Sequence, residues 1–178
     1  PYDAAKPIEV IKSKMDSGKT YQLFQYILQN GIQSGVFTSS RESFANSFYQ
    51  ILKEFVEKKL PPISSFSLPK DSLLTVIEHA PDQFEIKQQG EQQRSIHCYL
   101  YTEVRDWRDL PENSFIVIQM ESLWKLRIPP PALFAMDECT TCLAQLSSPT
   151  MKQLTRCRAM LEWLVKSASK VIAMDAKV

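Results

Sequence analysis

The sequence predicts an α/β domain with a central, mostly parallel sheet flanked by helices on both faces. Short apolar runs typical of buried strands alternate with longer segments whose apolar residues recur at helical spacing. Strands that alternate with helices are joined by crossover connections, which are typical of parallel sheets. A Gly-Lys-Thr triplet also stands between the first strand and the first helix, where nucleotide-binding loops carry it.

The first sixty residues contain two strand–helix pairs. Strands are expected over residues 8–11 and 35–39, and helices over residues 21–29 and 41–59. Leu23, Tyr26 and Ile27 share one face of the first helix, and Asn30 followed by glycine is a typical helix end.

Residues 60–95 are predicted to form an insertion between core elements. They mix prolines and serines with a polar run over residues 87–94, which indicates a solvated, Gln-rich loop. Residues 73–77 fit either a strand or a short helix.

The rest of the chain returns to the alternating pattern. Strands are expected over residues 96–101, 115–119, 132–136 and 171–175, a short helix over 121–126 and a long helix over 149–169. The inner side of the long helix is predicted to carry Leu154, Cys157, Met160, Leu161 and Leu164.

The composition indicates which class of protein this is but does not indicate a particular activity. With 178 residues, 44% of them hydrophobic, the chain can bury the core of one domain. Its net charge of +1 neither indicates nor excludes a local basic strip for nucleic acid. The sequence contains no apolar run of about 18 residues, so it predicts no membrane span. No signal peptide is visible, so the four cysteines are expected to be reduced thiols inside the cell. The missing initiator methionine suggests a piece of a longer protein.

The segment from Ser13 to Thr20 resembles a P-loop, the phosphate-binding turn G-x-x-x-x-G-K-[ST]. Backbone N–H groups and the following helix N-terminus would surround an anion there. Lys19 is expected to neutralise phosphate charge and the Thr20 hydroxyl to bind Mg²⁺. The predicted nucleotide-binding residues are Met15, Asp16, Ser17, Gly18, Lys19 and Thr20.

An acidic pair follows the apolar strand at residues 132–136. Asp137 is expected to bind Mg²⁺, and Glu138 to orient or deprotonate the attacking water. A solvated strand end is the simpler interpretation of this pair alone. A P-loop-like segment lies more than a hundred residues upstream, and a P-loop followed by an acidic pair is the motif order of an NTPase core. This order predicts ATP and Mg²⁺ as ligands, with Lys19 and Glu138 as catalytic residues.

Cys139 and Cys142 form a C-x-x-C pair that could bind zinc. No second close pair accompanies it, so buried structural thiols are the favoured interpretation. His79 and His97 lack any partner pattern, and we expect His97 to be structural.

Small hydroxyl residues follow two of the predicted strands. Ligands gather beyond the carboxyl ends of parallel strands, where Thr38, Ser39 and Ser122 could contact a phosphate backbone. Helix capping by Ser39, Ser40 and Ser122 explains the same pattern.

Five segments together resemble herpesvirus-type replication origin-binding helicases. Asp137 and Glu138, followed by Gln145 to Met151, are similar to motif II of that family. Residues 14–20 are similar to its P-loop, 38–41 to its motif Ia, 118–123 to its motif Ib and 171–176 to its motif III strand. Asp16 stands where the family usually carries glycine, and its carboxylate is expected to weaken nucleotide binding.

The resemblance implies the first RecA-like domain of a superfamily 2 helicase, spanning residues 1–178. Thr38, Ser39, Arg41 and Ser122 would then contact single-stranded DNA. The second RecA-like domain, with its arginine finger, would lie outside this chain, so the chain alone is expected to hydrolyse ATP very slowly. Other replication proteins would be partners, membranes would not, and the location would be the nucleus or a viral replication compartment.

Two other functions fit the residues. A P-loop phosphotransferase would need arginine-rich lid elements, and the candidates Arg156 and Arg158 fall on a predicted core helix instead. A non-catalytic or weakly active interaction module that retains the fold is the other alternative, suggested by Asp16.

Overall fold

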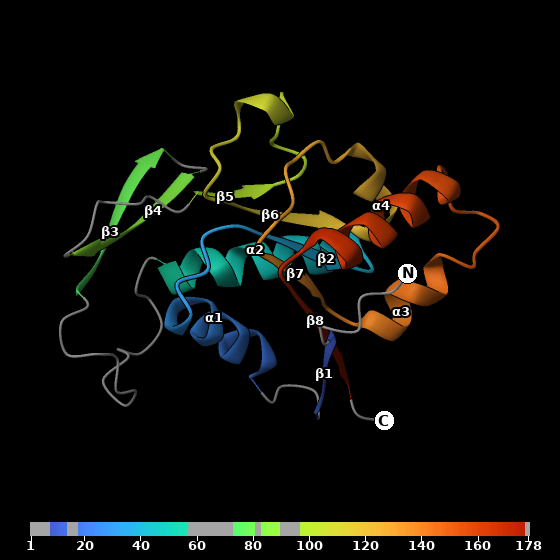
Figure 1. Ribbon diagram of the computed structural model, residues 1–178, viewed down its shortest axis with the longest axis horizontal. Helices are drawn as coiled ribbons and strands as arrows, with labels where there is room; N and C mark the ends of the chain where they lie inside the picture. Colours follow the sequence, from blue (N-terminus) through green and yellow to red (C-terminus); the bar gives the residue numbers. More distant parts are fainter. Residues whose placement is uncertain (1–7, 14–17, 57–72, 81–82, 90–96, 177–178) are drawn as a thin grey trace.

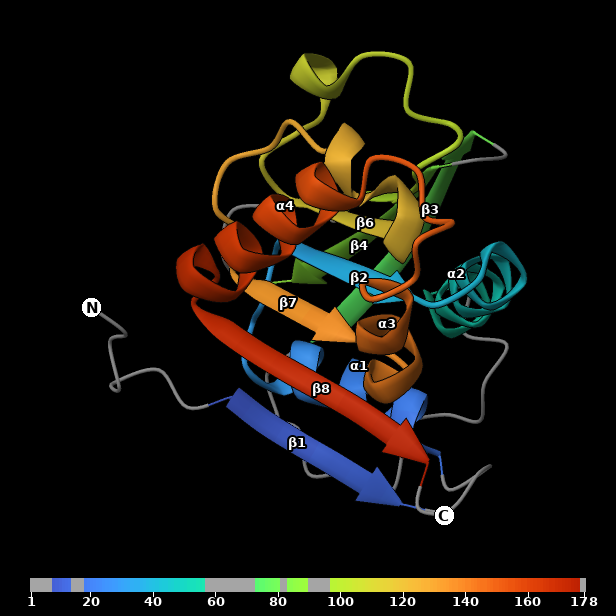
Figure 2. The same cartoon turned by 90° about the vertical axis from the view of Figure 1, so that its right-hand side faces the viewer.

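Six parallel strands form the central sheet of the computed structural model, which describes residues 8–13, 18–56, 73–80, 83–89 and 97–176. Across the sheet the order is β1-β8-β7-β2-β6-β5, and Figure 2 shows the run from β1 to β6. The strands are β1 (Ile8–Ser13), β2 (Gly35–Ser39), β5 (His97–Leu100), β6 (Ser114–Gln119), β7 (Leu133–Met136) and β8 (Lys170–Ala176). Because every pair is parallel, the carboxyl ends of all six strands meet at one edge.

Helices cover both faces of this sheet, as the sequence predicts. One face carries α1 (Lys19–Gln29) and α2 (Glu42–Val56). The other carries α3 (Cys139–Gln145), α4 (Leu154–Ser167) and the 3-10 helix η2 (Met120–Lys125), as Figure 2 shows. Successive strand side chains point to opposite faces, so Val36 packs in one core and Phe37 in the other. The predicted α/β fold class is confirmed.

Outside the central sheet, β3 (Leu73–Ala80) and β4 (Gln83–Gln89) form an antiparallel hairpin beyond the β5 edge (Figure 1). Of the two structures that residues 73–77 fit, the strand is the one formed. The predicted Gln-rich loop is wrong over residues 87–89, because β4 pairs there with β3 and the partner strand supplies a backbone ladder that local propensity does not predict. The rest of that loop, residues 90–94, lies outside the described residues.

Helix boundaries differ from the prediction around the acidic pair. The long helix begins at Leu154 and not at residue 149, because Gln153 adopts left-handed backbone angles (φ 60°, ψ 27°) that interrupt an α-helix. Residues 139–145 form α3, which the sequence does not predict. Residues 120–125 form a 3-10 helix. A short 3-10 turn, η1 (Trp107–Asp109), precedes β6. None of the helices in the described part of the chain has the length and apolar character needed to cross a membrane.

Candidate nucleotide-binding site

The described part of the P-loop-like segment is its end, Gly18 to Thr20. Gly18 has left-handed backbone angles (φ 75°, ψ 21°), which glycine adopts at little cost, and α1 begins at the next residue. Lys19 and Thr20 therefore stand in the first helical turn, where backbone N–H groups without intrahelical partners favour an anion. The predicted nucleotide-binding residues Met15, Asp16 and Ser17 lie outside the described residues.

The acidic pair forms a sharp turn between β7 and α3. Asp137 N donates to the carbonyl oxygen of Thr38 at 2.9 Å, which continues the pairing of β7 with β2 beyond Met136. Glu138 then adopts left-handed angles (φ 51°, ψ 53°), which cost a residue with a Cβ about 1–2 kcal/mol. Strain of this kind persists where the surrounding structure holds it, and it often marks a functional site.

The charges around Asp137 place Lys19 at the same edge of the sheet. Burial raises the pKa of Asp137, and the nearby carboxylates of Glu138 and Asp175 raise it further. The Glu138 N–H, which donates to Asp137 Oδ1 at 3.1 Å, lowers that pKa, and so does the positive charge of Lys19. Only β8 separates β1 from β7, so the two strand ends lie roughly 10 Å apart. A bound metal–triphosphate could span that distance.

Asp175, at the end of β8, holds the start of α3. Its Oδ2 accepts hydrogen bonds from the backbone N–H of Thr140 (3.1 Å), from the Thr140 hydroxyl and from Cys139 Sγ (3.5 Å). Glu138, which occupies the N-cap position of α3, makes no side-chain cap. Asp175 therefore supplies from another strand the cap that the local sequence lacks. Sequence reasoning did not assign it, although an acidic residue at the end of the last strand was a usable signal.

Ser40 and Gln145 join the segment after β2 to the acidic turn. Ser40 Oγ donates to Glu138 Oε2 at 3.2 Å, and Gln145 Nε2 donates to the carbonyl oxygen of Ser40 at 2.5 Å. Both residues belong to segments that resemble helicase motifs, and Ser40 was also expected to cap a helix, but their contacts with Glu138 and with one another were not expected. Gln145 could have been found from its spacing, because seven residues along a helix return to the same face as Glu138.

The residues predicted to contact DNA lie beside this turn but differ in exposure. Thr38, Ser39 and Ser122 are only 2–4% exposed, whereas Arg41 is exposed, with its guanidinium 5.8 Å from the centre of the Phe44 ring.

Two of the three buried hydroxyls have partners. Ser39 Oγ donates to the carbonyl oxygen of Arg41 (3.1 Å), and Ser122 Oγ accepts from Gln119 (3.2 Å). Thr38 Oγ1 has no hydrogen-bond partner within the described ranges, and it borders a cavity of about 10 Å³ that Asp137 also lines.

The cysteines have a structural role in this fold. Cys98, Cys139, Cys142 and Cys157 are all free and buried, as predicted for Cys139 and Cys142. Burial raises the pKa of Cys142 to about 12, and its thiol donates to the carbonyl oxygen of Asp137 at 3.2 Å. Among the residues that the structure describes, no group of three or more His, Cys, Asp or Glu could hold a metal ion.

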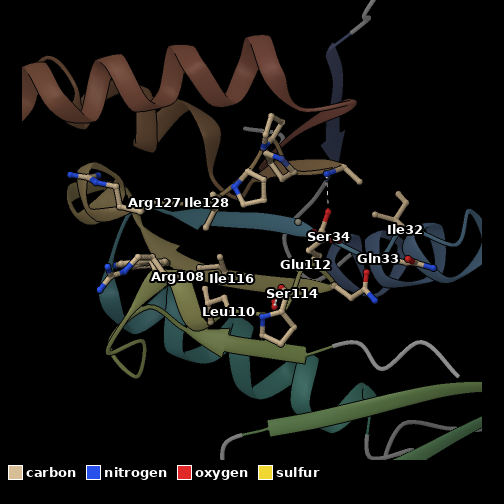
Figure 3. Close-up of a pocket in the computed structure, with 18 of the residues that line it drawn as sticks. Ile32, Gln33, Ser34, Arg108, Leu110, Glu112, Ser114, Ile116, Arg127 and Ile128 are labelled. Carbon is tan, nitrogen blue, oxygen red and sulfur yellow. Dashed lines mark hydrogen bonds between the residues drawn. The ribbon is translucent and has the colours of Figure 1, made fainter.

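A cavity of about 1080 Å³ lies at the opposite, amino edge of the sheet (Figure 3). Its walls come from the loops before β2, β6 and β7, with Trp107, Ile128 and Pro131 among the apolar residues. Arg108, Glu112 and Arg127 are its charged residues. We place the candidate site at the carboxyl edge, because that edge combines the acidic pair and the positive charge of Lys19 with a strained turn, and because parallel α/β sheets bind ligands there.

Comparison with known proteins finds viral replication proteins. A family model described as origin of replication binding protein matches residues 92–178, a range that contains the acidic pair but not Lys19. The chain is 28% identical, over 97% of its length, to the replication origin-binding protein of Psittacid herpesvirus 1. It is 24% identical, again over 97% of its length, to a protein of African swine fever virus whose name assigns it provisionally to a helicase/primase complex. It spans only 16% and 13% of these two relatives.

The resemblance to replication origin-binding proteins is therefore confirmed, at low identity over nearly the whole chain. A solved structure with a related shape is the ATPase domain of the large terminase of Thermus phage P74-26. Its TM-score is 0.45 at 10% identity, and the match covers 95% of this chain and 60% of that one.

Proposed function

We propose that this chain is the first RecA-like, ATP-binding domain of a superfamily 2 helicase that acts in viral DNA replication. ATP hydrolysis would drive movement along single-stranded DNA and unwinding. The observation that carries the proposal is the position of Asp137 and Glu138 in a strained turn at the carboxyl edge of the sheet, where the charge of Lys19, in the first turn of α1, lowers the pKa of Asp137. The names of the relatives, which are replication proteins, support the same role.

The side chains at this edge suit a magnesium–nucleotide complex. Carboxylate and hydroxyl oxygens are the ligands that Mg²⁺ prefers, and Asp137 and Thr20 supply one of each. Lys19 and the N-terminus of α1 would bind the phosphates, together with residues 15–18. When bound, ATP supplies the phosphoryl group that is transferred to water.

Glu138 would orient that water and accept its proton. The two adjacent carboxylates would have different roles: Asp137 would bind the metal, and Glu138 would act as the base. Arg41, which is exposed, would contact a DNA phosphate, and the buried Thr38, Ser39 and Ser122 would support the segments beneath it. The second RecA-like domain would provide an arginine finger, so hydrolysis by this chain alone would be slow.

Steady-state ATP hydrolysis by the full-length protein, with and without single-stranded DNA, tests the proposal. Lys19→Ala removes the charge that faces the phosphates, and we expect kcat/KM to fall about 10²-fold or more. Lys166→Ala is the matched control, because Lys166 is an exposed lysine on α4 that pairs with Glu162 at 2.5 Å. It should leave hydrolysis unchanged.

Three results would contradict the proposal. Hydrolysis that survives Lys19→Ala would show that the P-loop assignment is wrong. A folded full-length protein that binds neither nucleotide nor DNA would favour the non-catalytic module. Phosphoryl transfer to a small molecule without stimulation by DNA would favour the phosphotransferase.

A further inference from the structure

We propose that Ser40 restrains the Glu138 carboxylate, and that single-stranded DNA bound over residues 38–41 releases it for hydrolysis. Ser40 would thereby make ATP turnover depend on DNA. This inference rests on the function proposed above and adds a mode of regulation to the same site.

The strand order shows which way the restraint acts. Ser40 follows β2, and β2 borders β7 on the side away from β8 and β1. The hydrogen bond from Ser40 Oγ to Glu138 Oε2 (3.2 Å) therefore draws this carboxylate toward β2, the side of β7 away from β1, after which the P-loop-like segment follows in the chain. The charge of Lys19 lowers the pKa of Asp137, the neighbouring carboxylate. The Glu138 side chain, the predicted base, is thus held on the β2 side of the acidic turn.

Helix α3 also binds Ser40 through a second hydrogen bond, from Gln145. Glu138 immediately precedes this helix and Gln145 is its last residue, and both side chains bond to Ser40: one to its hydroxyl, the other to its carbonyl oxygen at 2.5 Å. Ser40 itself is only 2% exposed. The result is a closed ring of contacts, so a displacement of the Ser40 backbone must break at least one bond or move α3.

Arg41 gives nucleic acid a means of causing that displacement. Arg41 is exposed, follows Ser40 directly, and its carbonyl oxygen accepts the hydrogen bond from Ser39 Oγ. A phosphate that pairs with the guanidinium would act on the backbone on the carboxyl side of Ser40. DNA then shifts the equilibrium only if it binds the released arrangement more tightly than the restrained one.

The strength of the hydrogen bond between Ser40 and Glu138 sets how much it can change the rate of ATP hydrolysis. A hydrogen bond to a charged group is worth enough to favour the bonded arrangement about tenfold or more. Breaking it by mutation should therefore raise DNA-independent turnover about tenfold and reduce the stimulation by DNA by the same factor.

The test measures ATP hydrolysis by the full-length protein with and without an oligodeoxythymidylate. For Ser40→Ala we expect basal kcat to rise about tenfold, with unchanged KM for ATP and an unchanged rate at saturating DNA. Ser40→Thr keeps a hydroxyl and should restore DNA dependence. The matched control is Ser114→Ala: Ser114 is also buried, but its hydroxyl donates to the carbonyl oxygen of Pro111 (2.5 Å) at the amino edge.

Each outcome is decisive. A higher basal kcat that Ser40→Thr reverses supports the restraint. Unchanged basal and stimulated rates for Ser40→Ala would overturn it, and so would a fall in both rates, since Ser40 would then assist Glu138. If Ser40→Ala does not fold, Gln145→Ala loosens the same ring and is interpreted in the same way. Wild-type turnover that does not depend on Lys19 would instead refute the proposed function itself.

Discussion

The two edges of the sheet differ in what their side chains bind. At the amino edge, serine hydroxyls bond to backbone groups: Ser34 Oγ accepts from the N–H of Ala132 (3.1 Å), and Ser114 Oγ donates to Pro111. At the carboxyl edge, two hydroxyls bond to carboxylates, Ser40 to Glu138 and Thr140 to Asp175, whereas Ser39 donates to the carbonyl oxygen of Arg41. The amino edge thus holds its loops together, whereas the carboxyl edge gathers charge.

The two edges also differ in the size of their cavities and in the residues that line them. The cavity of about 1080 Å³ at the amino edge combines a few charged residues with many apolar ones, whereas the acidic turn borders a cavity of only about 10 Å³. The strained Glu138 backbone and the raised pKa of Asp137 both belong to the carboxyl edge. Strand direction, and not cavity volume, is therefore the reason for placing the candidate site at the carboxyl edge.

The largest difference between the two edges is expected when one carboxylate at each edge is replaced by an amide. Glu138→Gln should lower kcat for ATP hydrolysis by about 10²–10⁴-fold, the usual contribution of a general base. Glu112→Gln, at the cavity of the amino edge, should leave kcat unchanged. Steady-state assays of the full-length protein measure both. Equal effects would mean that the edges do not differ in function.

At the amino edge, the free energy of unfolding should depend on close packing around Gly35. A Cβ built on Gly35, at the amino end of β2, would lie 2.8 Å from the Phe115 ring and 3.3 Å from the Leu133 carbonyl oxygen. Gly35→Ala should therefore lower the free energy of unfolding by about 1–3 kcal/mol. Gly31→Ala, which meets no atom within 4 Å but has φ +59°, should lower it by about 1 kcal/mol. Urea unfolding compares them, and a smaller loss at Gly35 would show that Phe115 moves aside.

Asp137 should give a smaller, pH-dependent effect. Because burial raises its pKa in the folded state, the folded chain favours the protonated carboxyl; that contribution is complete at low pH and is lost as pH rises through the folded-state pKa. Asp137→Asn should therefore raise Tm near pH 8, with no difference below the pKa of an unfolded aspartate. Thermal melts without nucleotide test this. A rise of equal size at both pH values would point to packing and not to charge.

Arg41 should show the smallest effect. If it neutralises one phosphate, Arg41→Ala should weaken binding of single-stranded DNA less than about tenfold and reduce the slope of log K against log salt by about 0.7. Arg108→Ala removes an exposed arginine at the amino-edge cavity and should change neither quantity. Fluorescence anisotropy over a series of salt concentrations measures both. An unchanged slope for Arg41→Ala would remove this residue from the DNA path.

The parts of the fold that local sequence determines were predictable. Apolar runs located β2 and β7 within one residue, and the acidic pair was expected at the end of β7. Helix α3 was not, because Cys139 to Thr141 have weak helix propensity and their cap comes from Asp175, far along the chain. Ser40 looked like a helix cap, and only the pairing of β2 with β7 brings it to Glu138. Contacts that depend on strand order cannot be deduced from spacing alone.

Strand β1 has a consequence for handling the isolated domain. It pairs with β8 alone among the described strands, and Ile8 and Val10 are 39% and 57% exposed. An uncovered outer strand with apolar side chains can recruit the same strand of another molecule, which leads to self-association. Glu9, which pairs with Lys170, and the exposed Lys12 place charges along that border and oppose such stacking.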